Sequence, residues 1–268
     1  MNRRVKCSTI AVAGVLLMAG MSWAGRPMAI DDADPVDVKQ FEFEAGAGYE
    51  YENNADCKHW DFPFGLACGV VPGLEVGVGF GSQFEERNEI IAESGAEDCV
   101  REERIGDLVI GAKWLFVSES LWCPRQSLVP SVKFPTADDR NGLGSGETDY
   151  DITWIASKSF GEKAGAHINV GYSWIGEPED EDVSDVVHYG LALDYQIIES
   201  LQLVGEVFAE NELLKGSDTI VQYNTGFRWG PAEGLTLDIA GGSKLSSDGP
   251  DLIATAGLTW DFGFNNTK

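Results

Sequence analysis

The stretch FEFEAGAGYEYE, residues 41–52, alternates strictly between two kinds of residue. Aromatic or small residues fill the odd positions, whereas glutamate and glycine fill the even ones. A period of two is that of a β-strand whose two faces meet different environments, one apolar and one aqueous. The apolar face could pack on a protein core or lie against lipid, so the rest of the chain has to distinguish these two folds.

Segments of this kind recur along the whole chain, and no long segment shows a helical repeat. We expect about twelve strands, each long enough to cross a bilayer when tilted. The predicted strands are residues 41–53, 59–71, 74–85, 105–117, 126–135, 148–160, 164–176, 185–198, 201–212, 219–230, 235–245 and 251–262.

The connections between these strands alternate in length. An outer-membrane β-barrel sorts its loops in this way, with tight periplasmic turns and larger external loops, whereas a soluble sandwich has no reason to. A connection of intermediate length, residues 118–125, falls on the short-turn side. The short turns are residues 72–73, 161–163, 199–200 and 230–234, and the longer, charged connections are 85–104, 136–147, 177–184 and 246–250.

Large rings on the apolar parity gather near strand ends, as Tyr223, Phe227 and Trp229 do in the predicted strand 219–230. Aliphatic and small residues occupy the middle of the strands. This distribution is typical of the aromatic girdles at membrane interfaces. A soluble β-sandwich, the alternative fold, would place its large rings in the middle of the core. We therefore predict an all-β fold, a closed antiparallel transmembrane β-barrel.

The first 24 residues have the pattern of a secretory signal peptide. Arg3, Arg4 and Lys6 precede an uncharged apolar run too short for a stable membrane span, and Ser22-Trp23-Ala24 forms a small-x-small cleavage site. We expect cleavage after Ala24 and export to the outer membrane. The predicted organisation is then an N-terminal segment at 25–40, the barrel at 41–264 and a tail at 265–268.

Charge and hydropathy exclude two classes of protein. Loss of the three basic residues takes the formal net charge from −25 to about −28, so a nucleic-acid partner, whose phosphates need a basic face, is excluded. After the signal peptide no uncharged stretch reaches the length of about 18 residues that a transmembrane helix needs. Any passage through a membrane must therefore use strands.

Four cysteines follow the predicted cleavage site, and none has the C-x-x-C spacing of a zinc site. An even number in an oxidising compartment suggests disulfides. Cys57 and Cys68 lie near opposite ends of one predicted strand, about 35 Å apart, which is too far for a bond. We predict a Cys57–Cys99 bridge between external loops and a Cys68–Cys123 bridge near the periplasmic turns.

The stretch TAGLTWDF, residues 255–262, ends the last predicted strand. Its polar Thr255, its Gly257 and the aromatic Trp260 and Phe262 resemble the C-terminal assembly signal of outer-membrane barrels, although six residues follow Phe262. We therefore expect two partners, the barrel-assembly machinery and outer-membrane lipid, in addition to a small-molecule solute.

Several blocks of the chain resemble a known family. They include GRPMAIDDADPVDVKQFEFEAGAGYEY, IGDLVIGAKW, PSVKFPTADDRNGLGSGETDYDITWIASKSF and DGPDLIATAGLTWDF. In this order they are similar to the phenol meta-pathway (phenol degradation) outer-membrane β-barrel, or transporter, family over nearly all of the mature chain. The resemblance implies a Gram-negative outer-membrane barrel connected by name with uptake of aromatic compounds. The acidic segment 85–104 is its clearest departure from these blocks.

The polar parity of the strands places many charged side chains in the predicted lumen. One interpretation is a mutually paired network that holds a narrow barrel in shape. The other is a selectivity lining whose acidic excess disfavours anions. The candidate lumen-lining residues are Glu42, Glu44, Glu50, Glu75, Asp107, Lys113, Lys133, Asp151, His167, Asp194, Glu206, Arg228 and Asp238, together with Asp261.

The stretch RPMAIDDADPVDVKQ, residues 26–40, precedes the first predicted strand and contains four aspartates and two prolines. It is either a loose periplasmic tail or a plug or ligand gate folded into the lumen. Both alternatives fit the sequence.

Catalysis is not predicted. A barrel phospholipase needs a serine, a histidine and a third polar residue together on the lipid face, but His167 and His188 fall on the polar parity and no nucleophile motif accompanies them. We expect no enzyme activity, no cofactor and no metal site.

We predict a channel for passive uptake of small solutes, hydrophobic or aromatic ones in particular. The alternatives are a structural or adhesive outer-membrane barrel with a sealed lumen, and a lipid-modifying enzyme. The sequence does not define the solute or the oligomeric state.

Overall fold

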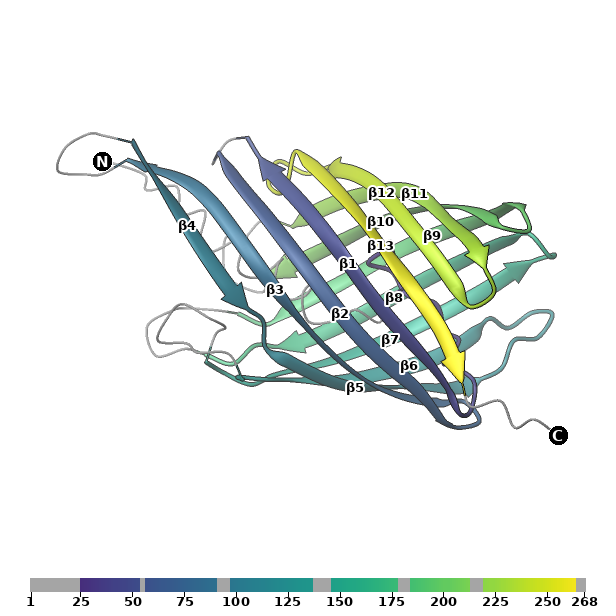
Figure 1. Ribbon diagram of the computed structural model, residues 1–268. Helices are drawn as coiled ribbons and strands as arrows, with labels where there is room; N and C mark the ends of the chain where they lie inside the picture. Colours follow the sequence, from purple (N-terminus) through teal and green to yellow (C-terminus); the bar gives the residue numbers. More distant parts are fainter. Residues whose placement is uncertain are drawn as a thin grey trace.

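The computed structural model describes residues 25–53, 56–90, 97–136, 146–177, 184–212 and 219–263. This part of the chain forms thirteen β-strands (Figure 1) and contains no helix long and apolar enough to cross a membrane. The strands are β1 (Gln40–Glu52), β2 (Cys57–Val71), β3 (Leu74–Ile90), β4 (Glu97–Ile105), β5 (Leu108–Val117), β6 (Arg125–Phe134), β7 (Asp149–Phe160), β8 (Ala164–Trp174), β9 (Val186–Ile198), β10 (Leu201–Glu212), β11 (Ile220–Ala232), β12 (Leu235–Lys244) and β13 (Leu252–Gly263).

The strands form one closed antiparallel barrel. β1 lies between β2 and β13 (Figure 1), and its pairing with β13 runs from Gln40 opposite Gly263 to Tyr51 opposite Leu252. β3 pairs with β5 along its first part and with β4 along its second part. β4 and β5 therefore act as one interrupted strand, and the described residues make a ring of twelve strand positions. The predicted barrel is confirmed.

The prediction of an external loop at residues 85–104 is wrong in part. β3 continues to Ile90 and β4 returns from Glu97, in a ladder from Ser82 opposite Ile105 to Ile90 opposite Glu97. Figure 1 shows this β3–β4 hairpin continuing past the neighbouring strands. Its sequence is charged on both parities, so it lacks the apolar face by which the other strands are recognised.

The faces of the barrel have the polarity of a membrane protein. On the outside, the side chains of Trp114 and Phe160 are 54% and 61% exposed, whereas Glu44, Glu75 and Lys113 are only 3%, 3% and 4% exposed. A soluble domain buries large apolar side chains and exposes its charges. The inverse arrangement is stable only when lipid covers the outer face and the polar groups find partners in the lumen.

The predicted Cys68–Cys123 disulfide is not formed, because both residues are free thiols. Cys68 lies in β2 and Cys123 lies in the β5–β6 turn, so β3 and β5 stand between them. Two strand spacings amount to about 10 Å, beyond the Cα separation that a disulfide allows. Cys99 belongs to β4 rather than to a loop, and its side chain lies outside the described residues, so the Cys57–Cys99 bridge stays a prediction.

Both thiols should therefore react with a maleimide when protein purified without reductant is unfolded. Peptide mass spectrometry should find Cys68 and Cys123 labelled in nearly every molecule. Serine at either position should remove one label and leave the other. A linked Cys68–Cys123 peptide would contradict this strand order.

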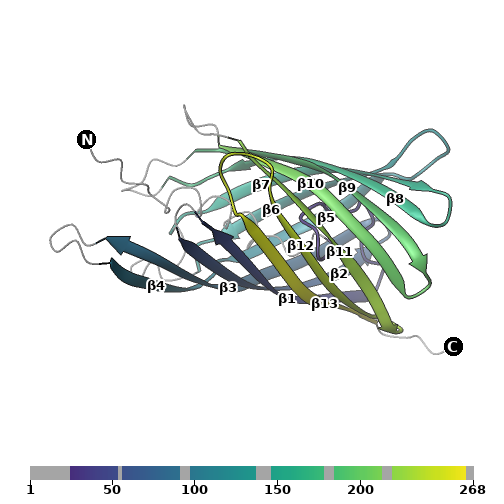
Figure 2. The ribbon, with the colours of Figure 1, turned by 90° about the horizontal axis from the view of Figure 1, so that it is seen from above.

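Residues 25–39 lie inside the ring and belong to no strand (Figure 2). An isolated bridge between Val38 and Gly69 of β2, and a hydrogen bond from the Lys39 N–H to the Gly69 carbonyl oxygen, fix the junction with β1. A Cβ at Gly69 would collide with the backbone carbonyl oxygens of Val36 and Asp37, so a side chain there would push the segment away.

Candidate functional site

The candidate site is the interior of the barrel where residues 25–39 cross it. Among the predicted lining residues, those with direct polar contacts to this segment, called the lumenal segment below, are Glu75, Lys113, Glu206, Arg228 and Asp238. Asp261 instead is exposed near the end of β13. The other lining candidates are buried or half-buried and are Glu42, Glu44, Glu50, Asp107, Lys133, Asp151, His167 and Asp194.

Arg26 anchors the beginning of the lumenal segment. Its guanidinium forms an ion pair with Asp238 of β12, with 3.3 Å between Nε and Oδ2. It also donates to Thr255 Oγ1 at 3.0 Å and to the Ala256 carbonyl oxygen at 2.9 Å, both on β13. Because Arg26 and Asp238 are both buried, each charge depends on the other for compensation.

A pair of glycines makes room for this guanidinium. Gly46 of β1 and Gly257 of β13 stand opposite each other, and a Cβ on either would collide with the Arg26 side chain. Gly257 thus has a contact in the lumen, whether or not it also serves the predicted assembly signal. On the other side, Arg228 of β11 donates to the carbonyl oxygens of Gly25 and Arg26.

Glu206 of β10 binds the backbone of the next residues. Its two carboxylate oxygens accept hydrogen bonds from the N–H groups of Ala29 at 3.0 Å and Ile30 at 2.9 Å. Asn224 of β11 donates to the same carboxylate at 2.8 Å. The apolar side chains of this stretch enter a small buried cluster made of Met28, Ile30, Ala192, Val204 and Phe208.

Lys113 of β5 pairs with the middle of the lumenal segment. Its Nζ lies 2.7 Å from Asp31 Oδ2 and 3.5 Å from the Asp34 carbonyl oxygen. The two charged side chains are 6% and 9% exposed. Asn169 of β8 can bond both backbone groups of Asp31, accepting from its N–H at 2.8 Å and donating to its carbonyl oxygen at 2.9 Å.

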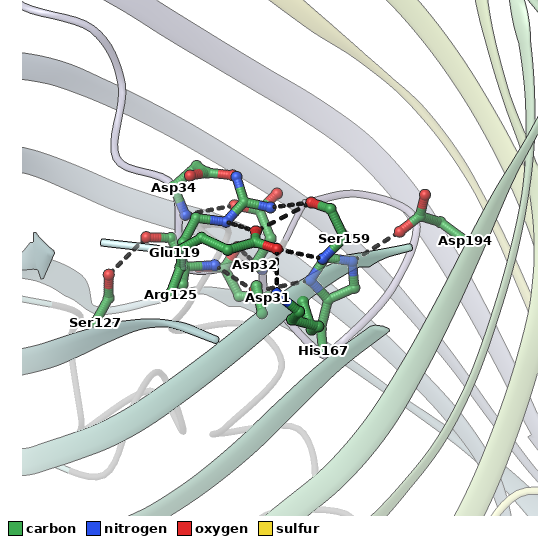
Figure 3. Close-up of polar contacts among 12 residues, drawn as sticks. Asp31, Asp32, Asp34, Glu119, Arg125, Ser127, Ser159, His167 and Asp194 are labelled. Carbon is green, nitrogen blue, oxygen red and sulfur yellow. Dashed lines mark hydrogen bonds and ion pairs between the residues drawn. The ribbon is translucent and has the colours of Figure 1, made fainter. Parts of the chain in front are cut away.

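A relay of hydrogen bonds holds Ala33, and Figure 3 labels its members Ser127, His167 and Asp194. The Ser127 hydroxyl donates to the Ala33 carbonyl oxygen at 2.6 Å, and the Ala33 N–H donates to Ser157 Oγ at 2.8 Å. Ser157 Oγ lies 2.8 Å from His167 Nδ1, and His167 Nε2 lies 2.7 Å from Asp194 Oδ2. The Asp194 carboxylate can only accept, so His167 Nε2–H donates to it, and in the neutral imidazole Nδ1 then accepts from the Ser157 hydroxyl.

Ser157, His167 and Asp194 share the connectivity of a hydrolase triad. Two observations favour a positioning role instead. Ser157 is 0% exposed and its hydroxyl oxygen already binds the Ala33 N–H, so a substrate has no access to it. The imidazole also uses Nδ1 for the serine and Nε2 for the carboxylate, the reverse of the protease arrangement.

Arg125 of β6 holds Asp34 at the short-turn end of the lumen (Figure 3). It also pairs with Glu119 at 3.2 Å and donates to Ser159 at 2.9 Å. A hydrogen bond from Lys158 holds the pKa of Glu119, in the β5–β6 turn, below its ordinary value. These groups are partly exposed, so each pair contributes little to stability.

Near the end of the segment, the Val36 N–H donates to Glu75 of β3 at 2.7 Å. The contacts from Arg26 to Val36 therefore reach β12, β10, β5, β7 and β3. Strands on different sides of the ring are tied together through one piece of chain, which crosses the lumen rather than lining one wall.

Other lumenal charges pair among the strands. Lys133 lies 2.5 Å from Asp149 and 3.6 Å from Asp107. Asp151 accepts from Ser173 at 2.7 Å and lies 2.8 Å from His188 Nε2. These pairs support the interpretation of a mutually satisfied network for this part of the lining.

A cavity of about 160 Å³ lies beside the lumenal segment, toward the long-loop end. Its wall combines apolar side chains, such as Phe208 and Ile253, with the carboxylates of Glu50 and Asp61. Met28 and Ile30 of the lumenal segment form part of the same wall.

A family model described as "Putative MetA-pathway of phenol degradation" matches residues 24–262. The chain belongs to this family. The match covers nearly the whole predicted mature chain, so the resemblance carried by the sequence blocks is confirmed. A search of curated proteins found no match.

Several solved structures share the fold of this phenol-degradation family member. An outer membrane channel from Pseudomonas putida F1 is 15% identical, with a TM-score of 0.65 over 86% of this chain and 98% of that one. The NanC porin is 8% identical, with a TM-score of 0.55 over 81% and 98%. The KdgM porin is 6% identical, with a TM-score of 0.52 over 83% and 99%. At these identities the likeness establishes the fold.

For this family member, sequence reasoning named five charged residues that contact the lumenal segment but missed Arg26 and the neutral polar partners of the segment. The missed residues on strands have side chains on the lumen-facing parity, as the predicted lining residues do. This shared parity was the signal that could have found them. The contact of Arg26 could not have been predicted, because nothing in its local sequence indicates that it pairs with the distant Asp238. The missed residues are Arg26, Ser127, Ser157, Asn169 and Asn224.

Proposed function

We propose that the barrel is a passive outer-membrane channel for small solutes and that the lumenal segment closes it. The observation that carries this proposal is the set of buried contacts from Arg26 to Val36, which tie the segment to strands around the ring. In a channel, a segment held by these contacts is a barrier that moves when the contacts break.

The cavity supports small solutes with an apolar body. Phe208 and Ile253 offer apolar contact, and a volume of about 160 Å³ suits a ring-sized molecule rather than an oligosaccharide. Hydrophobic or aromatic compounds, as the family description suggests, are therefore the proposed solutes. Outer-membrane localisation after signal cleavage is part of the same proposal.

Liposome swelling with purified protein tests the channel. Vesicles that contain the protein should admit small aromatic solutes faster than protein-free vesicles, and they should exclude solutes wider than the bore. Equal rates with and without protein, also after removal of the lumenal segment, would favour the structural or adhesive barrel. Turnover of labelled phospholipid would favour the lipid-modifying enzyme, for which the buried Ser157 gives no support.

The acidic cavity wall should make the open channel prefer cations. Replacing Glu50→Gln together with Asp61→Asn, in a chain without residues 27–38, should lower the cation-to-anion permeability ratio several-fold, because two carboxylates leave the wall. The reversal potential in a salt gradient measures this ratio. Glu162→Gln, in an exposed short turn, is the matched control and should leave it unchanged. An unchanged ratio in the double variant would remove these residues from the selectivity lining.

A further inference from the structure

Gly25 is the first residue expected to remain after signal cleavage, and it lies in the lumen next to Arg26. Its backbone N–H donates to Asp31 Oδ1 at 3.3 Å. Its carbonyl oxygen accepts from the Arg228 guanidinium. Gly25 is therefore held from two sides. Its nitrogen faces the carboxylate of Asp31, a residue that is only 6% exposed.

Two more carboxylates, those of Asp32 and Glu75, act on Asp31 and disfavour its ionised form. Burial raises the pKa of Asp31 to about 7, and the Lys113 ammonium opposes this rise. A positive charge at the Gly25 nitrogen, which contacts Asp31 Oδ1, would add to that of Lys113 and favour the ionised carboxylate. The other charged and titratable groups that act on Asp31 or Asp32 are Glu75, Lys113, Arg228 and His167, and the residue after Gly25 is Arg26, which is paired with Asp238.

We infer that Asp31 forms a lumenal binding site for an α-ammonium group, and that the amine released at Gly25 by cleavage after Ala24 occupies it. Hydrolysis of the Ala24–Gly25 peptide bond consumes one water and leaves a carboxylate on the released peptide and an amine on Gly25. This amine takes up a proton near neutral pH, because an α-amino group has a pKa of about 8. The inference rests on the proposed function, since it concerns the same lumenal segment.

Removal of the signal peptide would then be coupled to closure of the lumen. In the precursor, the Gly25 nitrogen is a neutral peptide N–H and makes an ordinary hydrogen bond to Asp31. In the mature chain, the same atom makes a charge-assisted one, which is shorter and stronger. Two extra residues before Gly25 would move the ammonium about 7 Å from Asp31 and lose this gain.

The test compares mature chains with different beginnings. Insertion of Gly-Ser between Ala24 and Gly25 keeps the cleavage site and lengthens the mature chain by two residues. In planar bilayers, the ratio of closed to open time should fall about tenfold, which corresponds to about 1.4 kcal/mol. The same insertion in an Asp31→Asn chain should have little effect. Gly-Ser added after Lys268 is the matched control and should change nothing.

A second variant removes the charge without added length. Gly25→Gln exposes an N-terminal glutamine, which cyclises to uncharged pyroglutamate, and it should lower the closed-to-open ratio in the same way. Intact mass and heat-modifiable migration would verify the N-terminus and the folded barrel of every variant.

Three results would overturn the ammonium site. They are a mature chain that does not begin at Gly25, an unchanged closed-to-open ratio in both variants, and an effect of the insertion that persists in full with Asp31→Asn. Failure of the proposed closure is distinguishable from these, because it appears as unchanged conductance after deletion of residues 27–38. If that deletion opens the channel and the two variants do not, only the ammonium site is wrong.

Discussion

Deletion of residues 27–38 should raise the single-channel conductance several-fold. The deleted stretch supplies the contacts to Glu206, Lys113 and Glu75, and it fills the bore between opposite strands. The barrel wall keeps its closed ladder from β1 to β13 without it, so the barrel should still fold. The measurement is conductance of purified protein in planar bilayers, with heat-modifiable migration as the check of folding.

Two further chains define what the deletion removes. A Gly/Ser linker of the same length in place of residues 27–38 should also give an open channel, because it lacks the anchoring side chains. Asp37→Asn, at an exposed position of the segment, should behave as the unmodified protein. Unchanged conductance in the deletion chain would show that the segment does not obstruct the lumen.

Lys113→Met should have the second largest effect. The substitution leaves Asp31 buried without its 2.7 Å partner while the segment is in place. Breaking a buried ion pair from one side costs about 3–5 kcal/mol, which would shift the closed-to-open ratio by about a hundredfold or more. Because the barrel wall does not depend on this pair, the expected result is frequent opening of a folded channel.

The pair can be tested from the other side as well. Adding Asp31→Asn to Lys113→Met removes the uncompensated carboxylate and should restore part of the closed time. Such recovery separates loss of a charge pair from general loosening, because independent defects would add. A Lys113→Met channel that stays as closed as the unmodified protein would mean that this pair does not hold the segment.

The wall of the barrel could be predicted from the sequence because its physical cause is local. Each strand must present one parity to lipid and the other to the lumen, and the stretch 41–52 displays this alternation without reference to the rest of the chain. The β3–β4 hairpin escaped prediction for the same reason. It extends past the neighbouring strands, and residues 85–104 have no apolar parity to reveal it.

The interior of the barrel was less predictable because its contacts join distant parts of the chain. Arg26 and Asp238 are 212 positions apart, and neither has a local pattern that selects the other. The aspartates and prolines of residues 26–40 were compatible with a tail as well as with a plug. Only the three-dimensional arrangement brings Gly46 and Gly257 together as the space for a guanidinium.

The central claim is that the lumenal segment occupies the bore of the protein in its membrane. A chain with its native cysteines replaced by serine and with Ala33→Cys and Ser157→Cys places two thiols where the Ala33 N–H and Ser157 Oγ are 2.8 Å apart. Ala33→Cys with Ser173→Cys is the control, since Ser173 lies six residues beyond His167 on β8, or about 20 Å along the strand. Non-reducing peptide mapping of intact outer membranes should find the first pair joined in most molecules and the control pair unjoined. No joined peptide from the first pair, in a barrel that is folded and inserted, would contradict the account.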